Sequence, residues 1–245
     1  MINETLTSGH PAQGKAATIT LLLPTLNEVV GFKAIFPHID RTLFDDIVVL
    51  DGRSKDGTVE FALEQNLRVM TQLRKGLGPG VFDACSTLET DYVIEFSLDG
   101  NCLPECLPPL VQKLREGYDL VIVSRYLPPA KSTDDTWMTA LGNWMFSLLI
   151  RWLGPGRITD SLGMYRGFRT SIVREPEFEK LLYGPVFEPL TSAFSNLKKM
   201  RITEIPGDEP LRIGGISKMS IWYNGSCILW MIIRCYLIKF GLLRL

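Results

Sequence analysis

The chain has 245 residues, of which 46% are hydrophobic, and this is enough for one large globular domain with an appended segment. Its 26 basic and 27 acidic residues give a formal net charge of −1. That balance argues against general nucleic-acid binding, which needs a basic excess, so we expect no nucleic-acid partner.

The first 17 residues are predicted to form a flexible leader. Residues 1–18, "MINETLTSGHPAQGKAAT", lack the charged start and the apolar core of a signal peptide. Regular hydrophobic patterning begins at the end of this stretch, so we place the start of the folded domain at residue 18.

Five apolar segments with β-branched residues predict buried strands, at residues 18–25, 45–52, 67–72, 91–100 and 118–127. Helical patterns separate them, at residues 27–43, 54–66, 74–89 and 104–117. Strands that are apolar throughout and alternate with helices indicate a mostly parallel sheet with helices on both faces. The predicted fold class is therefore α/β and Rossmann-like.

Polar residues follow the ends of four of these strands, at residues 25–28, 51–52, 99–101 and 124–125. Ligands of such sheets bind at the carboxyl ends of the strands, so we expect these residues to gather along one rim. Asp99 and Asn101 follow a buried run directly. A metal ion, a substrate hydroxyl or a tight turn would each supply the partner that an acid needs there.

The pattern changes after residue 126. The sequence predicts a loop at 128–137, a helix at 138–154, an irregular polar segment at 156–169, and a short strand with a basic, glycine-rich loop at 200–220. Lys131, Asp134 and Asp135 lie in the first loop, which is either a solvated loop or a lid over the site.

Residues 221–245 are strongly apolar and predict an amphipathic helical tail. A membrane-spanning helix needs about 20 apolar residues, whereas Arg234 and Lys239 interrupt this segment. We expect the tail to lie on a membrane surface, with its tryptophans at the headgroups. Packing onto the domain, or onto a second copy in a homo-oligomer, is the alternative.

The five cysteines form no CxxC pair. Cys102 and Cys106 are four residues apart, but no second pair of zinc ligands lies nearby in the sequence. Free thiols in a reducing compartment, the cytoplasm, are the preferred interpretation. "GLGPG" at 76–80 departs from the G-x-G-x-x-G pattern and follows the third predicted strand, which argues against a dinucleotide-dependent dehydrogenase.

Several segments resemble the motifs of the inverting glycosyltransferase family 2, which has the GT-A fold. They are "LLLPTLNE" (21–28), "IVVLDGRSKDGT" (47–58), "RKGLGPG" (74–80) and "DYVIEFSLDGN" (91–101). Later segments resemble the dolichyl-phosphate mannose synthase branch: "LVIVSRY" (120–126), "TDSLGMYRGFR" (159–169), "FEP" (187–189) and "RIGGISKMS" (212–220). The resemblance predicts a GT-A domain over about residues 18–220, followed by the tail at 221–245.

The resemblance implies a nucleotide-sugar donor site on the first half of the rim. The residues that it assigns to the donor are Pro24, Thr25, Glu28, Asp51, Lys75 and Asp99. Asp51 would accept hydrogen bonds from the base or a ribose hydroxyl. Asp56, Gly57 and Thr58 are better interpreted as a helix cap than as ligand contacts.

Asp99 and Asn101 are the predicted ligands of Mg²⁺ or Mn²⁺, a cofactor that would neutralise the diphosphate leaving group. The sequence departs here from the family's Asp-x-Asp pattern, because Asn101 can ligate a cation but brings no charge. Either the metal is held more weakly or a further carboxylate contributes. Leu50 and Arg53 are departures in the second motif, and Arg53 indicates a changed contact with the donor.

The acceptor side is predicted to bind phosphate through Arg125, Arg212 and Lys218, because guanidinium groups suit bidentate phosphate binding. Asp99, Arg125 and Asp160 are the predicted catalytic residues. A phosphate acceptor is already ionised and needs no strong base. A sugar hydroxyl would need one, with Asp160 as the first candidate and Glu188 as the second. The alternative for Asp160 is a helix cap or an ion pair with Arg166 or Arg169.

The sequence thus predicts a metal-dependent hexosyltransferase that moves a sugar from a GDP- or UDP-sugar to a polyprenyl phosphate with inversion. It would work in the cytoplasm, peripherally bound to the membrane. Trp137, Trp144 and Trp152 would form an apolar approach for the polyprenyl chain, or part of an ordinary core helix. Two alternatives remain: a transferase with a saccharide acceptor in cell-surface glycan synthesis, and a non-catalytic nucleotide-sugar-binding protein.

Overall fold

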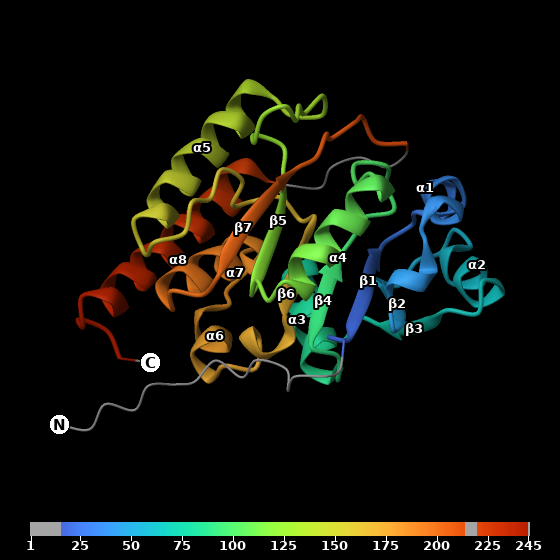
Figure 1. Ribbon diagram of the computed structural model, residues 1–245, viewed down its shortest axis with the longest axis horizontal. Coiled ribbons are helices and arrows are strands. Elements are labelled where there is room, and N and C mark those ends of the chain that lie inside the picture. The colour runs from blue at the N-terminus through green and yellow to red at the C-terminus, as the bar shows by residue number, and fades with distance from the viewer. Residues whose placement is uncertain (1–15, 214–219, 245) are drawn as a thin grey trace.

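The structure is a computed structural model that describes residues 16–213 and 220–244. Its centre is a seven-stranded sheet with the order β3-β2-β1-β4-β6-β5-β7 (Figure 1). The strands are β1 (Ile19–Thr25), β2 (Asp46–Asp51), β3 (Arg68–Thr71), β4 (Tyr92–Glu95), β5 (Leu120–Ser124), β6 (Arg166–Arg169) and β7 (Ile202–Pro206). All five predicted strands are present, and the expected short strand near residue 200 is β7.

The sheet is parallel apart from β6, which runs antiparallel to both β4 and β5. The prediction that 156–169 is irregular throughout was wrong, because β6 lies in this segment. This strand is not evident from the sequence because it contains Arg166, Gly167 and Arg169, none of which is typical of a buried strand. The two arginines are tolerated there because Arg166 donates to backbone carbonyls and Arg169 pairs with Asp119 at 2.8 Å.

Two predicted boundaries differ from the structure. β4 ends at Glu95, and residues 96–98 continue to Asp99 as a buried irregular segment rather than as strand. The helix predicted over 27–43 is shorter in the structure, where α1 spans Val29–Ile35. Two 3₁₀ turns follow it, Phe36–His38 and Arg41–Leu43. Pro37 lacks the N–H that a continuing helix needs, which explains the early end.

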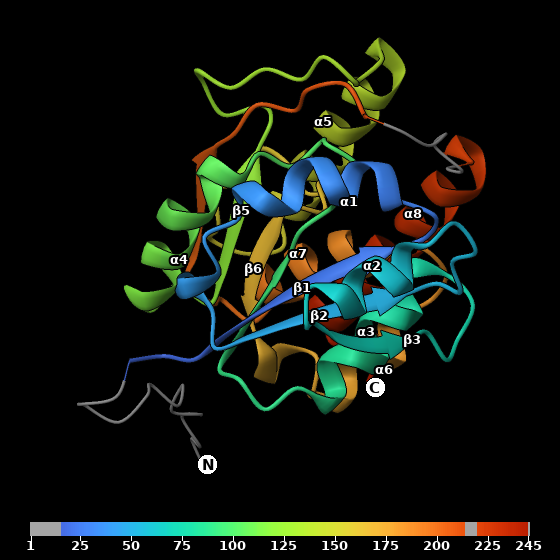
Figure 2. The ribbon, with the colours of Figure 1, turned by 90° about the vertical axis from the view of Figure 1, so that its right-hand side faces the viewer.

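Helices cover both faces of the sheet, as predicted (Figures 1 and 2). One hydrophobic core lies under α1, α2 (Thr58–Glu64) and α4 (Leu107–Arg115). The other lies under α3 (Leu77–Thr87), α5 (Trp137–Arg151), α6 (Pro176–Leu181), α7 (Phe187–Leu197) and α8 (Ile221–Lys239). The molecule is thus a three-layer α/β/α structure.

The predicted C-terminal helix is α8, and it packs against α7 and α5 (Figure 1). Cys227, Ile228, Met231, Ile232 and Cys235 bury one side of it in the second core. Its other side remains exposed and largely apolar. Within the described ranges, α8 is the one helix whose length and composition, with a mean hydropathy of 1.3, would suffice to cross a membrane. A core helix passes the same test.

Candidate active site

The loops that follow β1 and β2 are tied together at the rim of the sheet. Thr25 and Asp51 are register partners at the two strand ends. The Asn27 N–H donates to Ser54 Oγ at 2.9 Å, and the Lys55 N–H donates back to Asn27 Oδ1 at 2.8 Å. Because each loop bonds the other, the first two motifs form one rigid corner.

Asp51 is buried and organises its own turn. Its Oδ2 accepts from the Arg53 N–H at 2.8 Å, and its Oδ1 accepts from the Ser54 N–H at 3.1 Å. Arg53 has a φ of 72°, so these bonds hold a non-glycine residue in the left-handed region. The carboxylate therefore shapes the loop, and its contact with a donor stays a prediction.

Asp56 confirms the helix-cap interpretation and extends it. Its Oδ1 accepts from the Thr58 N–H at 3.1 Å at the start of α2, and its Oδ2 accepts from the Val29 N–H at 3.0 Å at the start of α1. One carboxylate thus satisfies an unpaired donor at each of two helix starts.

The other predicted donor residues lie at the same rim. Pro24 belongs to β1, Glu28 precedes α1, and Lys75 lies in the turn between β3 and α3. Thr25 Oγ1 is buried and has no hydrogen-bond partner in the described part of the chain. A buried hydroxyl of this kind is costly unless a ligand satisfies it, which suits a binding surface.

The predicted metal ligands belong to a cluster that we call the Arg212 group: Asp99, Asn101, Asp134 and Arg212. Asp99 Oδ1 accepts from the Asn101 N–H at 3.0 Å, and Asn101 Nδ2 donates to Asp134 Oδ2 at 3.1 Å. Arg212 Nε donates to the same Asp134 oxygen at 3.1 Å. Arg212 Nη1 lies 3.7 Å from Asp99 Oδ2, so the guanidinium stands between two carboxylates.

The Arg212 group fits a hard divalent cation. Asn101 Oδ1 is buried and has no hydrogen-bond partner among residues 16–213 and 220–244. Together with the two carboxylates it offers oxygen ligands, which Mg²⁺ and Mn²⁺ prefer. No cluster of three or more His, Cys, Asp or Glu side chains suited to a metal occurs in the described ranges, so a cation here would take the Asn101 amide or water as further ligands beside the two carboxylates.

Gly100 allows the segment that ends at Ile213 to approach Asp99 closely. The Ile213 N–H donates to the Asp99 carbonyl at 2.7 Å. A Cβ at Gly100 would lie 2.7 Å from Ile213 Cγ1, and φ of Gly100 is 95°, so a side chain there is strained. Lys218, the other predicted cation of this loop, lies outside the described residues.

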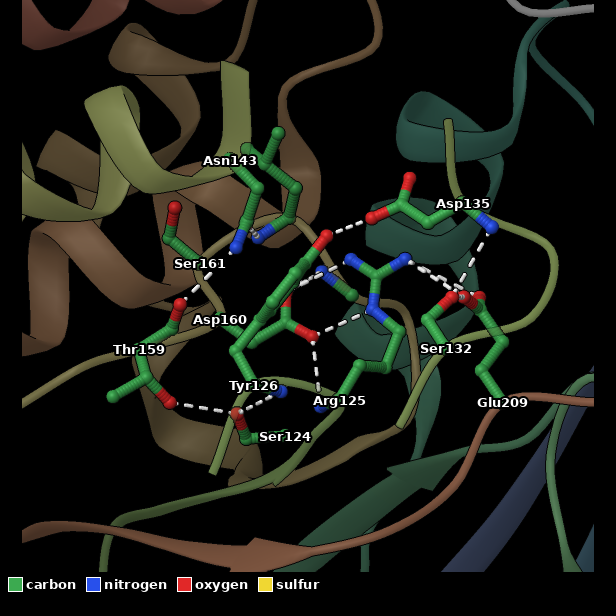
Figure 3. Close-up of polar contacts among 12 residues, drawn as sticks. Ser124, Arg125, Tyr126, Ser132, Asp135, Asn143, Thr159, Asp160, Ser161 and Glu209 are labelled. Carbon is green, nitrogen blue, oxygen red and sulfur yellow. Dashed lines mark hydrogen bonds and ion pairs between the residues drawn. The ribbon is translucent and has the colours of Figure 1, made fainter. Parts of the chain in front are cut away.

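Arg125 and Asp160, two predicted catalytic residues, form a buried ion pair that Glu209 completes (Figure 3). Arg125 Nε and Nη2 donate to Asp160 Oδ2 and Oδ1 at 2.7 and 2.9 Å. Arg125 Nη1 donates to both Glu209 oxygens at 3.2 Å. We call these three residues the Arg125 group.

Asp160 is fully buried within this group, and its Oδ1 also accepts from the Gly163 N–H at 3.0 Å. Burial by itself raises the pKa of Asp160, but the charge and hydrogen bonds of Arg125 outweigh it and lower the pKa. A carboxylate with a lowered pKa and occupied oxygens is a weak base. The contacts favour a role in positioning Arg125, and the predicted catalytic role of Asp160 stays a prediction.

Glu188, the second candidate base, lies at the start of α7 beside Arg166, which is fully buried. Arg166 donates to the Glu188 carbonyl at 2.5 Å and to Ser192 Oγ at 2.9 Å. Glu95 is the register partner of Arg166, and neither Glu95 oxygen has a hydrogen-bond partner in the described part of the chain. Burial raises the pKa of Glu188, and burial together with Glu188 raises the pKa of Glu95.

One acidic member of each group, Asp134 and Glu209, lies in a loop, and these two loops run side by side. The Thr133 N–H donates to the Glu209 carbonyl at 2.9 Å, and the Glu209 N–H donates to the Lys131 carbonyl at 2.9 Å. Figure 2 shows both segments crossing the top of the molecule together. The sequence pattern did not assign Glu209 to the site; the only signal was an acid inside a basic loop.

The chain matches the family model described as glycosyl transferase family 2 over residues 20–175. It is 30% identical to an undecaprenyl-phosphate mannosyltransferase of Micrococcus luteus, over 86% of this chain and 90% of that protein. It is 25% identical to a dolichol-phosphate mannosyltransferase of Pyrococcus furiosus, over 82% of this chain and 59% of that one.

Among solved structures, glucosyl-3-phosphoglycerate synthase of Mycobacterium tuberculosis, in complex with Mn²⁺, UDP and phosphoglyceric acid, is similar in fold. The TM-score is 0.64 at 21% identity, over 93% of this chain and 80% of that one. The predicted GT-A fold is therefore confirmed.

The matched span and the similarity to the Micrococcus relative place the chain in glycosyltransferase family 2. The predicted family is confirmed, and with it the class of enzyme, a glycosyltransferase.

Proposed function

We propose that this protein transfers a sugar from a nucleoside-diphosphate sugar to a polyprenyl phosphate, with inversion at the anomeric carbon. The proposal rests mainly on the hydrogen bonds of Asp160. Arg125 and the Gly163 N–H occupy both of its oxygens, so it lacks the free oxygen that a general base needs. A phosphate monoester is already ionised at neutral pH and needs no such base. Two relatives whose names state a polyprenyl-phosphate acceptor support the same acceptor class.

The chemistry follows from the residues at the rim. An acceptor phosphate oxygen attacks the anomeric carbon, the bond from that carbon to the donor's β-phosphate oxygen breaks, and the electron pair leaves with the nucleoside diphosphate. A bound Mg²⁺ or Mn²⁺ neutralises the charge of that leaving group. Asp99 and Asn101 hold the cation, and Pro24, Thr25, Glu28, Asp51 and Lys75 hold the nucleotide.

Arg212 and Lys218 bind the acceptor phosphate in this proposal. Arg125 keeps its bidentate pair with Asp160 and offers Nη1 to the phosphate when Glu209 gives way, because the 3.2 Å contacts to Glu209 are longer than the 2.7 Å contact to Asp160. Guanidinium groups bind phosphate oxygens strongly in a partly dehydrated site.

The exposed faces of α5 and α8 support peripheral binding to the cytoplasmic side of a membrane. These helices pack side by side (Figure 1), and Trp144, Trp152, Trp222 and Trp230 are exposed on them. Tryptophan favours the membrane–water interface, where its ring is half buried among headgroups. A second copy of the chain is the other occupant that we consider for this surface.

A two-phase transfer assay tests the proposal. Purified protein is incubated with a polyprenyl phosphate, labelled GDP- and UDP-sugars in turn, and Mg²⁺ or Mn²⁺, and the label is then partitioned between butanol and water. We expect metal-dependent label in butanol with one donor. Metal-dependent donor hydrolysis without organic label would contradict the acceptor and favour a saccharide. Absence of both would favour the non-catalytic alternative.

A further inference from the structure

We propose that Asp134 is a third ligand of the divalent cation that Asp99 and Asn101 bind, and that the Arg212 guanidinium occupies the position of this cation in the metal-free protein. The inference rests on the metal use in the proposed function. It adds Asp134 as a metal ligand and Arg212 as the group that the metal displaces. It answers the question raised by Asn101, which leaves the metal motif one negative charge short.

The charges of the Arg212 group are those of a cation site. Asp99 and Asp134 both face the Arg212 guanidinium, at 3.7 Å and 3.1 Å. Two carboxylates this close to one cation repel each other when it leaves, so another cation must replace it. A divalent ion in the place of the guanidinium would bring one more positive charge and would neutralise the two carboxylates.

The Asn101 amide can turn its oxygen toward the proposed cation position. Its Nδ2 lies 3.1 Å from Asp134 Oδ2, and its Oδ1 is buried without a hydrogen-bond partner in the described residues. A half-turn of the amide plane interchanges the two atoms and brings Oδ1 to about that distance from Asp134. Two neighbouring oxygen ligands of an octahedral Mg²⁺ are also about 3 Å apart, since each bond is about 2.1 Å.

The loop of Asp134 is held in place, whereas the Arg212 side chain has only weak contacts. The neighbouring Thr133 bonds Glu209 through its N–H and its hydroxyl, so the Asp134 loop is fastened to the adjacent segment. Arg212 makes one single-donor bond to Asp134 and one longer contact to Asp99. Arrival of the cation therefore releases the arginine. The freed guanidinium can then bind the acceptor phosphate, so the metal binds before the acceptor.

Mn²⁺ binding to the full chain tests the inference without any transfer reaction. Free Mn²⁺ is measured by electron paramagnetic resonance in titrations of the wild type, Asp134→Asn, Arg212→Gln and Asp135→Asn. We expect Asp134→Asn to weaken Mn²⁺ binding at least about tenfold. Mutation of a residue that only orients a metal ligand already lowers metal affinity about 10–100-fold. Arg212→Gln should tighten binding about fivefold, which is the upper range for an exposed ion pair.

Asp135→Asn is the matched control, because this carboxylate lies in the same loop but bonds the Tyr126 hydroxyl instead. It should bind Mn²⁺ like the wild type. Unchanged affinity in Asp134→Asn would contradict the inference, and so would unchanged or weaker affinity in Arg212→Gln, which is an exposed substitution that should fold. No Mn²⁺ binding by the wild type, even with GDP or UDP present, would instead contradict the metal use of the proposed function.

Discussion

Two arginines at the same rim each stand between two carboxylates, yet the two clusters differ in burial and geometry. In the Arg125 group the side chains of Arg125, Asp160 and Glu209 are 18%, 0% and 14% exposed, and the principal pair is bidentate. In the Arg212 group the side chains of Arg212, Asp99 and Asp134 are 35%, 12% and 28% exposed. Each cluster has a formal charge of −1.

The difference shows how burial decides what an ion pair does. A buried, fully hydrogen-bonded pair is costly to separate, because each partner would be left as an uncompensated charge. A partly exposed pair with long contacts contributes little to stability and exchanges partners easily. The Arg125–Asp160 pair is therefore a rigid part of the site, whereas the Arg212 group can exchange its guanidinium for another cation.

The largest expected effect is on catalysis by the Arg212 group. Asp99→Asn keeps the acceptor for the Asn101 N–H but removes a charged metal ligand. We expect the transfer rate to fall about 10³-fold, since the bound metal supplies several kcal/mol of charge stabilisation in the transition state. Denaturant unfolding should show a nearly unchanged free energy. Wild-type turnover in this variant would contradict the site assignment.

The Arg125 group should instead govern stability. Asp160→Asn leaves Arg125 buried beside a neutral amide, and we expect a loss of about 3–5 kcal/mol in the free energy of unfolding. Asp46→Asn, which breaks the exposed pair with Arg68, is the control and should cost at most about 1 kcal/mol. Similar losses in both variants would contradict the comparison.

The pH dependence of this loss has a definite sign. Because the pKa of Asp160 is lowered from 3.8, the ionised carboxylate stabilises the fold above that pH. The stabilisation disappears as pH falls through the lower pKa of the folded state. The difference between wild type and Asp160→Asn should therefore be full near pH 6 and shrink below pH 3.8.

A smaller effect is expected beside Arg166, which is fully buried. Its neighbour Glu95 has a raised pKa because of burial, so the folded protein holds a proton that the unfolded chain releases above pH 4.5. Glu95 should make the free energy of unfolding of the wild type fall as the pH rises above 4.5, by at most about 1.4 kcal/mol per pH unit. Glu188 also has a raised pKa, so Glu95→Gln should reduce this slope in urea unfolding at pH 5 to 8. An unchanged slope would show that Glu95 is not its source.

Much of the fold could be predicted because its signals are local. Apolar runs such as residues 18–25 and 118–127 identify buried strands, and Asp56 before Thr58 identifies a helix start. β6 escaped prediction because a four-residue strand with two arginines has no apolar pattern of its own. Arg169 is stabilised by a partner distant in sequence, Asp119, which is 50 residues away.

The candidate site was predictable in its residue types but not in its pairing. Strand ends identified Asp51, Asp99 and Arg125 as rim residues. No local pattern relates Arg125 to Asp160, 35 residues away, or Arg212 to Asp134, 78 residues away. Those pairs arise only when the sheet brings the loops together, and they change the interpretation of Asp160 from a candidate base to the partner of an arginine.

The most direct test of a metal-dependent transfer at Asp99 compares wild type and Asp99→Asn in the butanol partition assay, with Mn²⁺ and with a chelator. We expect labelled polyprenyl-phosphate sugar in butanol from the wild type with Mn²⁺ only, and almost none from Asp99→Asn. Equal organic label from both proteins, or label that persists in chelator, would contradict this central claim.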